Sequence, residues 1–208
     1  MTKELTSRKG GSFLIEESTA EDIFTPEDFS EEQTMIRDMT EQFVEDEVLP
    51  QVERIEHKEW DVTLKLLRRC SELGLLGIEV PEQYGGENLD KVSAMIVAEK
   101  MARVASFAVS YGGHSGIGTL PIVYFGTEAQ KSKYLPLLCE AEKISAYALS
   151  ESGSGSDALA AKTAANLSSD GTHWVMNGEK MWITNAAFAD IFITFAQAEG
   201  KQFSCFIV

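Results

Sequence analysis

The chain has 208 residues, 44% of them hydrophobic and 25% charged, as in an ordinary globular protein with a genuine core. Its 33 Asp and Glu side chains outnumber 18 Lys and Arg, which gives a formal net charge of −15. Because the basic residues are scattered and no apolar run reaches about 18 residues, we expect neither a nucleic-acid partner nor a membrane span.

The three cysteines, Cys70, Cys139 and Cys205, lie far apart in apolar stretches. No CxxC pair and no histidine at ligand spacing accompanies them, so we expect reduced core residues instead of a disulfide framework or a zinc site. The first residues lack an apolar signal segment and carry too many acidic residues for a mitochondrial transit peptide. We therefore expect a cytoplasmic protein.

The first part of the chain reads as a polar arm followed by helices. Residues 1–29 predict an extended arm, docked through the apolar patch Phe13-Leu14-Ile15. Ser30 and Gln33 have the spacing of a capping box, and apolar residues at i, i+4 positions then predict an amphipathic helix up to Pro50.

Three more helices are predicted before residue 143. Apolar periodicity indicates one helix over residues 62–73 and another over residues 92–107. Thr127 and Gln130 form a second capping-box pattern, which opens a helix limited by Pro136.

The period changes to two from about residue 144, which is typical of strands. Residues 144–149, 190–195 and 203–208 each predict one. Asn177-Gly178 lies between residues 173–176 and 181–184 and predicts a hairpin with a type I′ turn.

The order of these elements predicts an α+β fold without βαβ alternation. We expect an arm over residues 1–29, an all-α domain over 30–142 and an antiparallel β domain over 143–208. Because the chain stops inside an apolar strand pattern, we also expect it to be part of a longer protein.

Two glycine-rich segments are candidates for tight packing or ligand contact. Residues 153–157, Gly-Ser-Gly-Ser-Asp, directly follow a strand and fit neither the dinucleotide fingerprint nor a Walker A loop, but their amides and hydroxyls can approach a phosphate. On spacing alone they are a plain polar loop or a phosphate site. Residues 111–116 are more typical of a helix terminus or tight packing, and His114 has no triad context.

Several segments in combination identify a resemblance. Residues 147–151, the loop 153–157 and residues 177–185 together resemble the middle domain of the acyl-CoA dehydrogenase family, and residues 148–160 fit its first signature. The chain has Ser150 where the family commonly has Thr, and Ser152 where it has Pro. Residues 75–86 and 125–136 agree as well, so the resemblance covers residues 30–208.

The resemblance implies an FAD enzyme that oxidises an acyl-CoA thioester to the trans-2-enoyl-CoA in fatty-acid β-oxidation. It further implies that an electron-transfer flavoprotein accepts the electrons, and that the full-length protein forms a homo-oligomer. Relatives of the same fold that use oxygen, namely acyl-CoA oxidases and flavin monooxygenases, and a non-catalytic acyl-CoA-binding subunit are the alternatives.

The site residues follow from the same resemblance, position by position. It implies flavin contacts for Tyr147, Leu149, Ser150, Trp182, Ile183 and Thr184, and a contact with the FAD pyrophosphate and the acyl-CoA for Ser156. A flavin ring requires a flat apolar wall and a few hydrogen-bond donors, and an indole with hydroxyl groups provides both.

No catalytic base is assigned within the chain. Glu151 is expected to order its own loop, because the family takes its catalytic glutamate from a C-terminal helical domain that these 208 residues lack. We therefore predict that the chain alone binds FAD weakly and has no dehydrogenase activity.

Overall fold

The computed structural model describes residues 14, 15, 17, 24–200 and 202–208. The expected arm lies largely outside these residues. The part of its apolar patch that is described is not docked, because Leu14 and Ile15 are 74% and 88% exposed.

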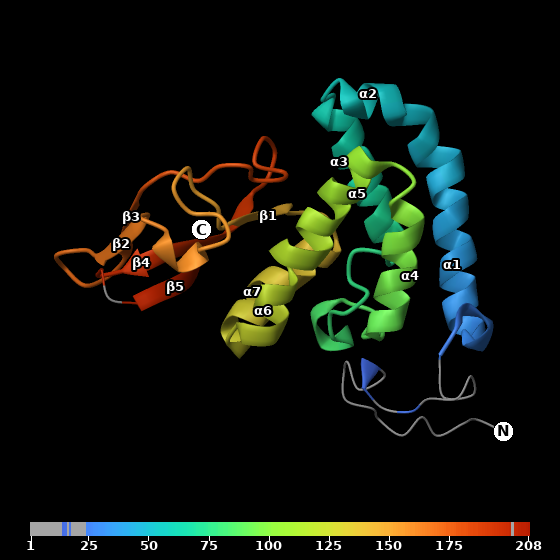
Figure 1. Ribbon diagram of the computed structural model, residues 1–208, viewed down its shortest axis with the longest axis horizontal. Helices are drawn as coiled ribbons and strands as arrows, with labels where there is room; N and C mark the ends of the chain where they lie inside the picture. Colours follow the sequence, from blue (N-terminus) through green and yellow to red (C-terminus); the bar gives the residue numbers. More distant parts are fainter. Residues whose placement is uncertain (1–13, 16, 18–23, 201) are drawn as a thin grey trace.

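Helices come first and strands follow, as the sequence predicts, and the two groups lie side by side (Figure 1). The α-helices are α1 (Glu31–Phe43), α2 (Val52–Glu56), α3 (Trp60–Glu72), α4 (Lys91–Met101), α5 (Ala105–Gly112), α6 (Leu120–Phe125) and α7 (Glu128–Cys139). The strands are β1 (Ser145–Ala148), β2 (Ala164–Leu167), β3 (Trp174–Asn177), β4 (Ile191–Ala198) and β5 (Gln202–Ile207). Single turns of 3-10 helix occur at Pro26–Asp28, Leu49–Gln51, Glu82–Tyr84 and Ala158–Ala160, and π-helical turns at Val44–Val48 and Gly113–Gly118.

Both predicted capping boxes are present. The Ser30 hydroxyl accepts the Gln33 amide at 3.1 Å, and the Thr127 hydroxyl accepts the Gln130 amide at 3.3 Å. In each case the glutamine side chain accepts the cap residue's own N–H, so local sequence alone sets where α1 and α7 begin.

The helix ends differ from the predictions at three places. Helical turns carry the chain past Pro50 to the end of α2, since a proline is accepted in the first turn of a helix. The helix predicted over residues 92–107 is divided, because Val104 is extended at φ −124° and turns its side chain into the core. Pro136 lies inside α7 and does not end it. Proline has no N–H to donate to the carbonyl of Ser132 one turn earlier, but Ser132 is exposed, so water can reach that carbonyl.

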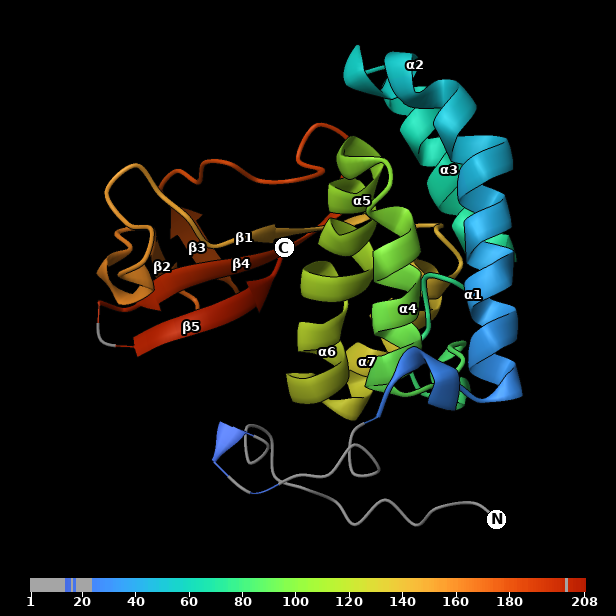
Figure 2. The same cartoon turned by 45° about the vertical axis from the view of Figure 1, so that its right-hand side comes forward.

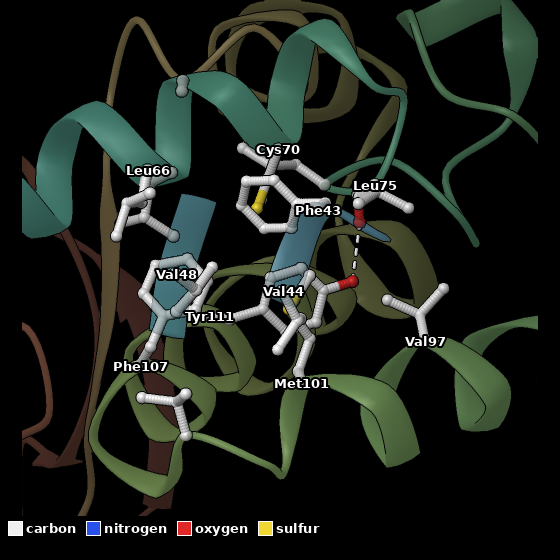
Figure 3. Packing of buried hydrophobic residues seen from close by; sticks show 14 of the residues in the cluster. Phe43, Val44, Val48, Leu66, Cys70, Leu75, Val97, Met101, Phe107 and Tyr111 are labelled. Carbon is white, nitrogen blue, oxygen red and sulfur yellow. Dashed lines mark hydrogen bonds between the residues drawn. The ribbon is translucent and has the colours of Figure 1, made fainter. Parts of the chain in front are cut away.

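The helices enclose one apolar core. Phe43 at the end of α1, and Val44 and Val48 of the π-helical turn that follows, meet Phe107 and Tyr111 of α5 (Figure 3). Inside this core the Tyr111 hydroxyl donates to the Leu75 carbonyl at 2.6 Å, so its polar atom is satisfied where water is excluded.

The sheet is mixed, which corrects the expectation of an antiparallel domain. Its strand order is β1-β4-β2-β3: β1 and β2 pair with different parts of one edge of β4, and β5 pairs along the other edge. β4 pairs parallel with β1 and β2, whereas the β2–β3 and β4–β5 pairs are antiparallel. Parallel neighbours need a long crossover, which the segment containing β2 and β3 provides between β1 and β4, and the segment containing β3 between β2 and β4.

The predicted hairpin around Asn177-Gly178 is not formed. β3 pairs with β2 instead, Trp174 lying opposite Leu167, and residues 181–184 form a loop. Gly178 has φ 157°, and a Cβ on it would lie 2.4 Å from the Thr163 hydroxyl. Contact with residue 163 therefore directs the chain away from β3 at this glycine.

A second apolar cluster joins the helices to the sheet. Ile122 of α6 and Leu135 and Leu138 of α7 share it with Ile191 and Ile193 of β4. Figure 2 shows β1 and β4 reaching toward α5 and α6 at this junction. The two parts of the chain are thus held together by buried side chains.

Cys70 and Cys139 are buried, as expected, whereas Cys205 is exposed. Cys205 lies on β5, whose only described strand neighbour is β4, so a residue in an apolar stretch can still face solvent there. Across the described segments, no helix has the length and apolarity needed to cross a bilayer.

Candidate functional site

Most of the predicted site residues lie where β1 ends and where the loop of residues 178–190 returns to it. The amide of Met181 donates to the Ser150 carbonyl at 2.9 Å, which places Trp182 next to the end of β1. Among the described strands β1 pairs only with β4. The start of its other edge contacts the π-helical turn Gly113–Gly118, and no described strand pairs with the rest of that edge.

Glu151 ties three chain segments together. Its carboxylate accepts the Lys180 ammonium group at 2.7 Å and the backbone amides of Lys162 and Thr163 at 2.6 and 3.0 Å. Lys180 also donates to the Leu149 carbonyl at 3.0 Å. The side chains of Glu151 and Lys180 are 8% and 10% exposed, so this is a buried ion pair.

Burial by itself would raise the pKa of Glu151, but the hydrogen bonds from Lys180, Thr163 and Lys162 prevail and lower it to about 2. The carboxylate is therefore charged at neutral pH, and both of its oxygens accept hydrogen bonds from neighbouring segments. This is the ordering role expected from the sequence, and it leaves Glu151 unsuited to be a base.

Trp182 has unusual local geometry. Its φ is 59°, in the left-handed region that bulky residues rarely adopt, and its side chain is 86% exposed. A strained backbone that presents a bare indole to solvent is typical of a ligand contact.

Asn185 anchors the loop to the rest of the molecule. Its Nδ2 donates to the carbonyl of Ser110 on α5 at 2.9 Å and to that of Ser145 on β1 at 3.4 Å. Its φ of 68° suits asparagine. Gly113 makes room for the adjacent Thr184, because a Cβ at Gly113 would lie 2.9 Å from the Thr184 methyl group. The glycine cluster of residues 111–116 thus serves tight packing, as one of its two readings predicts.

A cleft of about 420 Å³ lies beneath this loop, between it, α3 and α5. Its lining includes Ile183, Thr184 and Asn185 of the loop. The buried side-chain polar atoms without a partner in the described residues are Thr63 Oγ1, Ser106 Oγ and Asn185 Oδ1, and all three residues line this cleft. Each such atom costs about 1–3 kcal/mol if it stays unpaired.

The structure brings some of the seven predicted residues together and not others. Ser150 and Trp182 are linked through Met181, and Ile183 and Thr184 continue the same loop. The hydroxyls of Ser150 and Thr184 make no side-chain hydrogen bond in the described part of the chain, and both residues are half-buried.

Tyr147 and Ser156 stand apart from that group. The Tyr147 ring packs on Phe195 of β4, with ring centroids 5.1 Å apart, so its side chain packs against the core. Ser156 is exposed, two residues after the turn that a reciprocal backbone pair between Glu151 and Ser154 closes. Of the seven residues, Ile183 and Thr184 line the cleft beneath the loop.

Sequence reasoning did not find two residues that organise the site, Lys180 and Asn185. Both lie within the segment 177–185 that carries the resemblance, next to Met181 and Thr184. For Asn185 the available signal was an asparagine suited to a left-handed turn, whereas nothing in this largely polar segment distinguishes Lys180 from a surface lysine.

Comparisons with known proteins agree with this geometry. Residues 30–142 match the family model of the acyl-CoA dehydrogenase N-terminal domain, and residues 146–208 match that of the middle domain. A probable acyl-CoA dehydrogenase of Bacillus subtilis is 55% identical over 201 residues, which are 97% of this chain and 34% of that protein.

Solved structures are similar over the same region. The crystal structure of an acyl-CoA dehydrogenase complexed with FAD from Bacillus anthracis matches with a TM-score of 0.94 and 58% identity, covering 97% of this chain and 35% of that one. A structure described as the electron transferring flavoprotein of Acidaminococcus fermentans matches with a TM-score of 0.79 and 35% identity, over 86% and 48% of the two chains.

The chain spans about a third to a half of the length of the relatives it matches. It covers 34% of one Bacillus subtilis protein and 48% of another. Both of its parts, the helices and the mixed sheet, correspond to domains of one family. The chain belongs to the acyl-CoA dehydrogenase family.

Proposed function

We propose that this chain carries one side of the FAD site of an acyl-CoA dehydrogenase, which converts an acyl-CoA to the trans-2-enoyl-CoA in fatty-acid β-oxidation. The observation that carries the proposal is Trp182, an 86% exposed indole held at positive φ beside the end of β1. Thr184 follows it on the same loop, and Ser150 is linked to it through the Met181 amide; the hydroxyls of Ser150 and Thr184 have no side-chain hydrogen bond among the described residues.

These residues fit a flavin by their chemistry. The indole offers a flat apolar wall, and the hydroxyls, together with the backbone amides of Leu149 and Ser150 after the end of β1, are assigned the hydrogen bonds to the polar edge of the ring. A bound flavin supplies the hydride acceptor for the bond between the α- and β-carbons. Ser156, exposed on its glycine-rich loop, is assigned to the pyrophosphate and the acyl-CoA. The base that removes the α-proton is assigned to no residue of this chain.

An apolar cavity of about 420 Å³ between α4 and α5 supports the proposal that the substrate carries an acyl chain. Met95, Ala98 and Met101 of α4 and Ala108 and Val109 of α5 are among its lining residues. Side chains of this kind bind a hydrocarbon chain by removing it from water, at roughly 0.8 kcal/mol for each buried CH₂ group.

We further propose that electrons pass to an electron-transfer flavoprotein, and that the complete protein is a cytoplasmic homo-oligomer. The similarity to a structure described as an electron transferring flavoprotein supports flavin-based electron transfer. The acyl-CoA substrate is supported by the names of the relatives in the family.

Titration of the chain with FAD, followed by flavin fluorescence, tests the cofactor site. We expect weak, saturable binding, because one side of a cofactor site gives only part of the affinity. Trp182→Ala should weaken binding about tenfold, as the loss of an aromatic wall contributes about 1.4 kcal/mol.

Trp174→Ala is the matched control, since Trp174 is a partly exposed tryptophan on β3, outside the site. It should leave the dissociation constant unchanged. Equal effects of the two substitutions, or no saturable binding at all, would refute the cofactor assignment.

A further inference from the structure

Gly113, the first residue of the π-helical turn Gly113–Gly118, lies against the loop that carries Trp182 and Thr184. It is buried, and its φ of −61° and ψ of −34° are ordinary helical values, so its backbone does not require glycine. Alanine is favoured over glycine inside a helix. What explains the glycine is therefore the space that it leaves beside the loop.

Thr184 and Asn185 fill that space. A Cβ at residue 113 would lie 2.9 Å from the Thr184 methyl carbon, Cγ2, and 3.2 Å from Asn185 Nδ2. Both distances are shorter than an ordinary van der Waals contact. At Gly112, one residue earlier in the same helical segment, an added Cβ would have no atom within 4 Å. The close approach is thus specific to Gly113.

This contact distinguishes the two branches of the Thr184 side chain. The three atoms nearest to the added Cβ are Cγ2 and Cβ of Thr184 and Nδ2 of Asn185, so the methyl group faces the helix and the hydroxyl does not. Substituents on a Cβ occupy staggered positions, and a methyl group placed against the helix leaves the other positions to the hydroxyl. That hydroxyl has no partner among the described residues and is not one of their buried unpartnered atoms, so it is open to a ligand.

Asn185 holds the loop against the same helix. Its Nδ2 donates to the carbonyls of Ser110 on α5 and Ser145 on β1, at 2.9 and 3.4 Å. These bonds fix the backbone directly after Thr184, while the space at Gly113 receives the Thr184 methyl group. Backbone and side chain of Thr184 are therefore both set by contacts with the helical segment of residues 110–113.

We propose that Gly113 is a positioning residue of the flavin site: by receiving the Thr184 methyl group, it sets the rotamer in which the Thr184 hydroxyl is presented to the flavin. The inference rests on the proposed function, because the FAD proposal is what assigns a role to this hydroxyl. Gly113 acts only through Thr184. There is room for one methyl group between the two residues, so a methyl at residue 113 must displace the one on Thr184.

FAD titration of Gly113→Ala tests the inference. The variant should bind FAD roughly three- to tenfold more weakly than the unchanged chain, as the loss of one hydrogen bond predicts. Thr184→Ser removes Cγ2 and keeps the hydroxyl, so it should relieve the contact. The double variant Gly113→Ala/Thr184→Ser should therefore bind FAD within roughly twofold of Thr184→Ser alone.

The visible absorption spectrum of the bound flavin gives a readout that a merely structural role would not move. Thr184→Val keeps the shape of the side chain and removes the hydroxyl, so its spectrum is that of a flavin without this hydrogen bond. At saturating FAD, the spectrum of Gly113→Ala should resemble that of Thr184→Val. The spectrum of the double variant should resemble that of the unchanged chain.

Gly112→Ala is the matched control for folding, because it adds the same methyl group where no atom lies within 4 Å. It should raise the melting temperature by about 1–4 °C through helix propensity, and Gly113→Ala should melt below it.

Three results would overturn the inference and leave the cofactor site intact: equal melting temperatures of Gly112→Ala and Gly113→Ala, FAD binding by Gly113→Ala as tight as by the unchanged chain, or a double variant that binds no better than Gly113→Ala. No saturable binding by the unchanged chain would instead refute the cofactor assignment, and this inference with it.

A crystal structure of the unchanged chain provides a measurement that needs no variant to fold. We expect Cγ2 of Thr184 to lie against Gly113 and the hydroxyl to face away from the helix. The opposite rotamer, with the hydroxyl on Gly113, would contradict the assignment.

Discussion

At the scale of single residues, the Glu151–Lys180 pair differs in kind from the other ion pairs of the chain. Its side chains are about nine-tenths buried, whereas those of the Lys143–Asp190 pair are 47% and 38% exposed. Removing one partner of a buried pair leaves the other charge buried with neither a partner nor water. Removing one partner of an exposed pair leaves a charge that water hydrates.

Lys180→Met should therefore lower the free energy of unfolding by about 3–5 kcal/mol, because Glu151 keeps its charge and loses its ammonium partner. Lys143→Met, at the exposed pair, should cost about 0–1 kcal/mol. Urea unfolding of the two variants measures the difference. Similar losses in both would show that Lys180 does not neutralise Glu151.

At the scale of elements, the path of the loop of residues 178–190 depends on Gly178, where the backbone passes close to Thr163. An alanine there would adopt φ 157° and place its Cβ 2.4 Å from the Thr163 hydroxyl and 2.7 Å from the Thr163 Cα. The backbone atom cannot rotate away, so the loop itself must move.

Gly178→Ala should destabilise the chain by about 1–3 kcal/mol and increase hydrogen exchange over residues 179–185, since the bond from Met181 to Ser150 depends on this close approach. Gly155→Ala is the control, as nothing lies within 4 Å of the added Cβ. Exchange that rises equally in both variants would contradict this account.

At the scale of the whole molecule, hydrogen bonds of the His114 ring connect the helices to the sheet. The ring is fully buried; Nδ1 accepts the amide of Ser145 on β1 at 3.0 Å, and Nε2 donates to the carbonyl of Leu138 on α7 at 3.0 Å. The bond accepted by Nδ1 requires the neutral ring, whereas Nε2 donates to the Leu138 carbonyl in either form. Burial lowers the pKa of His114 to about 4, against a weaker opposite effect of the Leu138 carbonyl.

The unfolding free energy should decrease as pH falls from 6.5, the ordinary pKa of histidine, toward 4. In that window the unfolded chain binds a proton that the folded chain does not, so acid favours unfolding, by about 3 kcal/mol in total. Chemical denaturation at several pH values measures the slope.

His114→Gln should flatten this slope, since glutamine does not titrate. His173→Gln, on an exposed turn, is the control and should leave the slope as it is. A slope that persists in His114→Gln would assign the acid sensitivity to other groups.

The sequence by itself determined the features that neighbouring residues control. The capping boxes at Ser30 and Thr127, the apolar period of α3 and the alternation of β1 and β4 involve contacts within a few residues, so the local pattern predicts them. The motif of residues 177–185 likewise identified the family, because a run of residues is specific without any coordinates.

Only the tertiary structure decided how these pieces meet. The choice of β2 as the partner of β3, the left-handed backbone at Trp182 and the bonds of Lys180 and Asn185 depend on segments far away in the chain. Asn177-Gly178 favours a hairpin locally, but the contact with Thr163 outweighs a turn preference because packing and buried charges are worth more than local propensity.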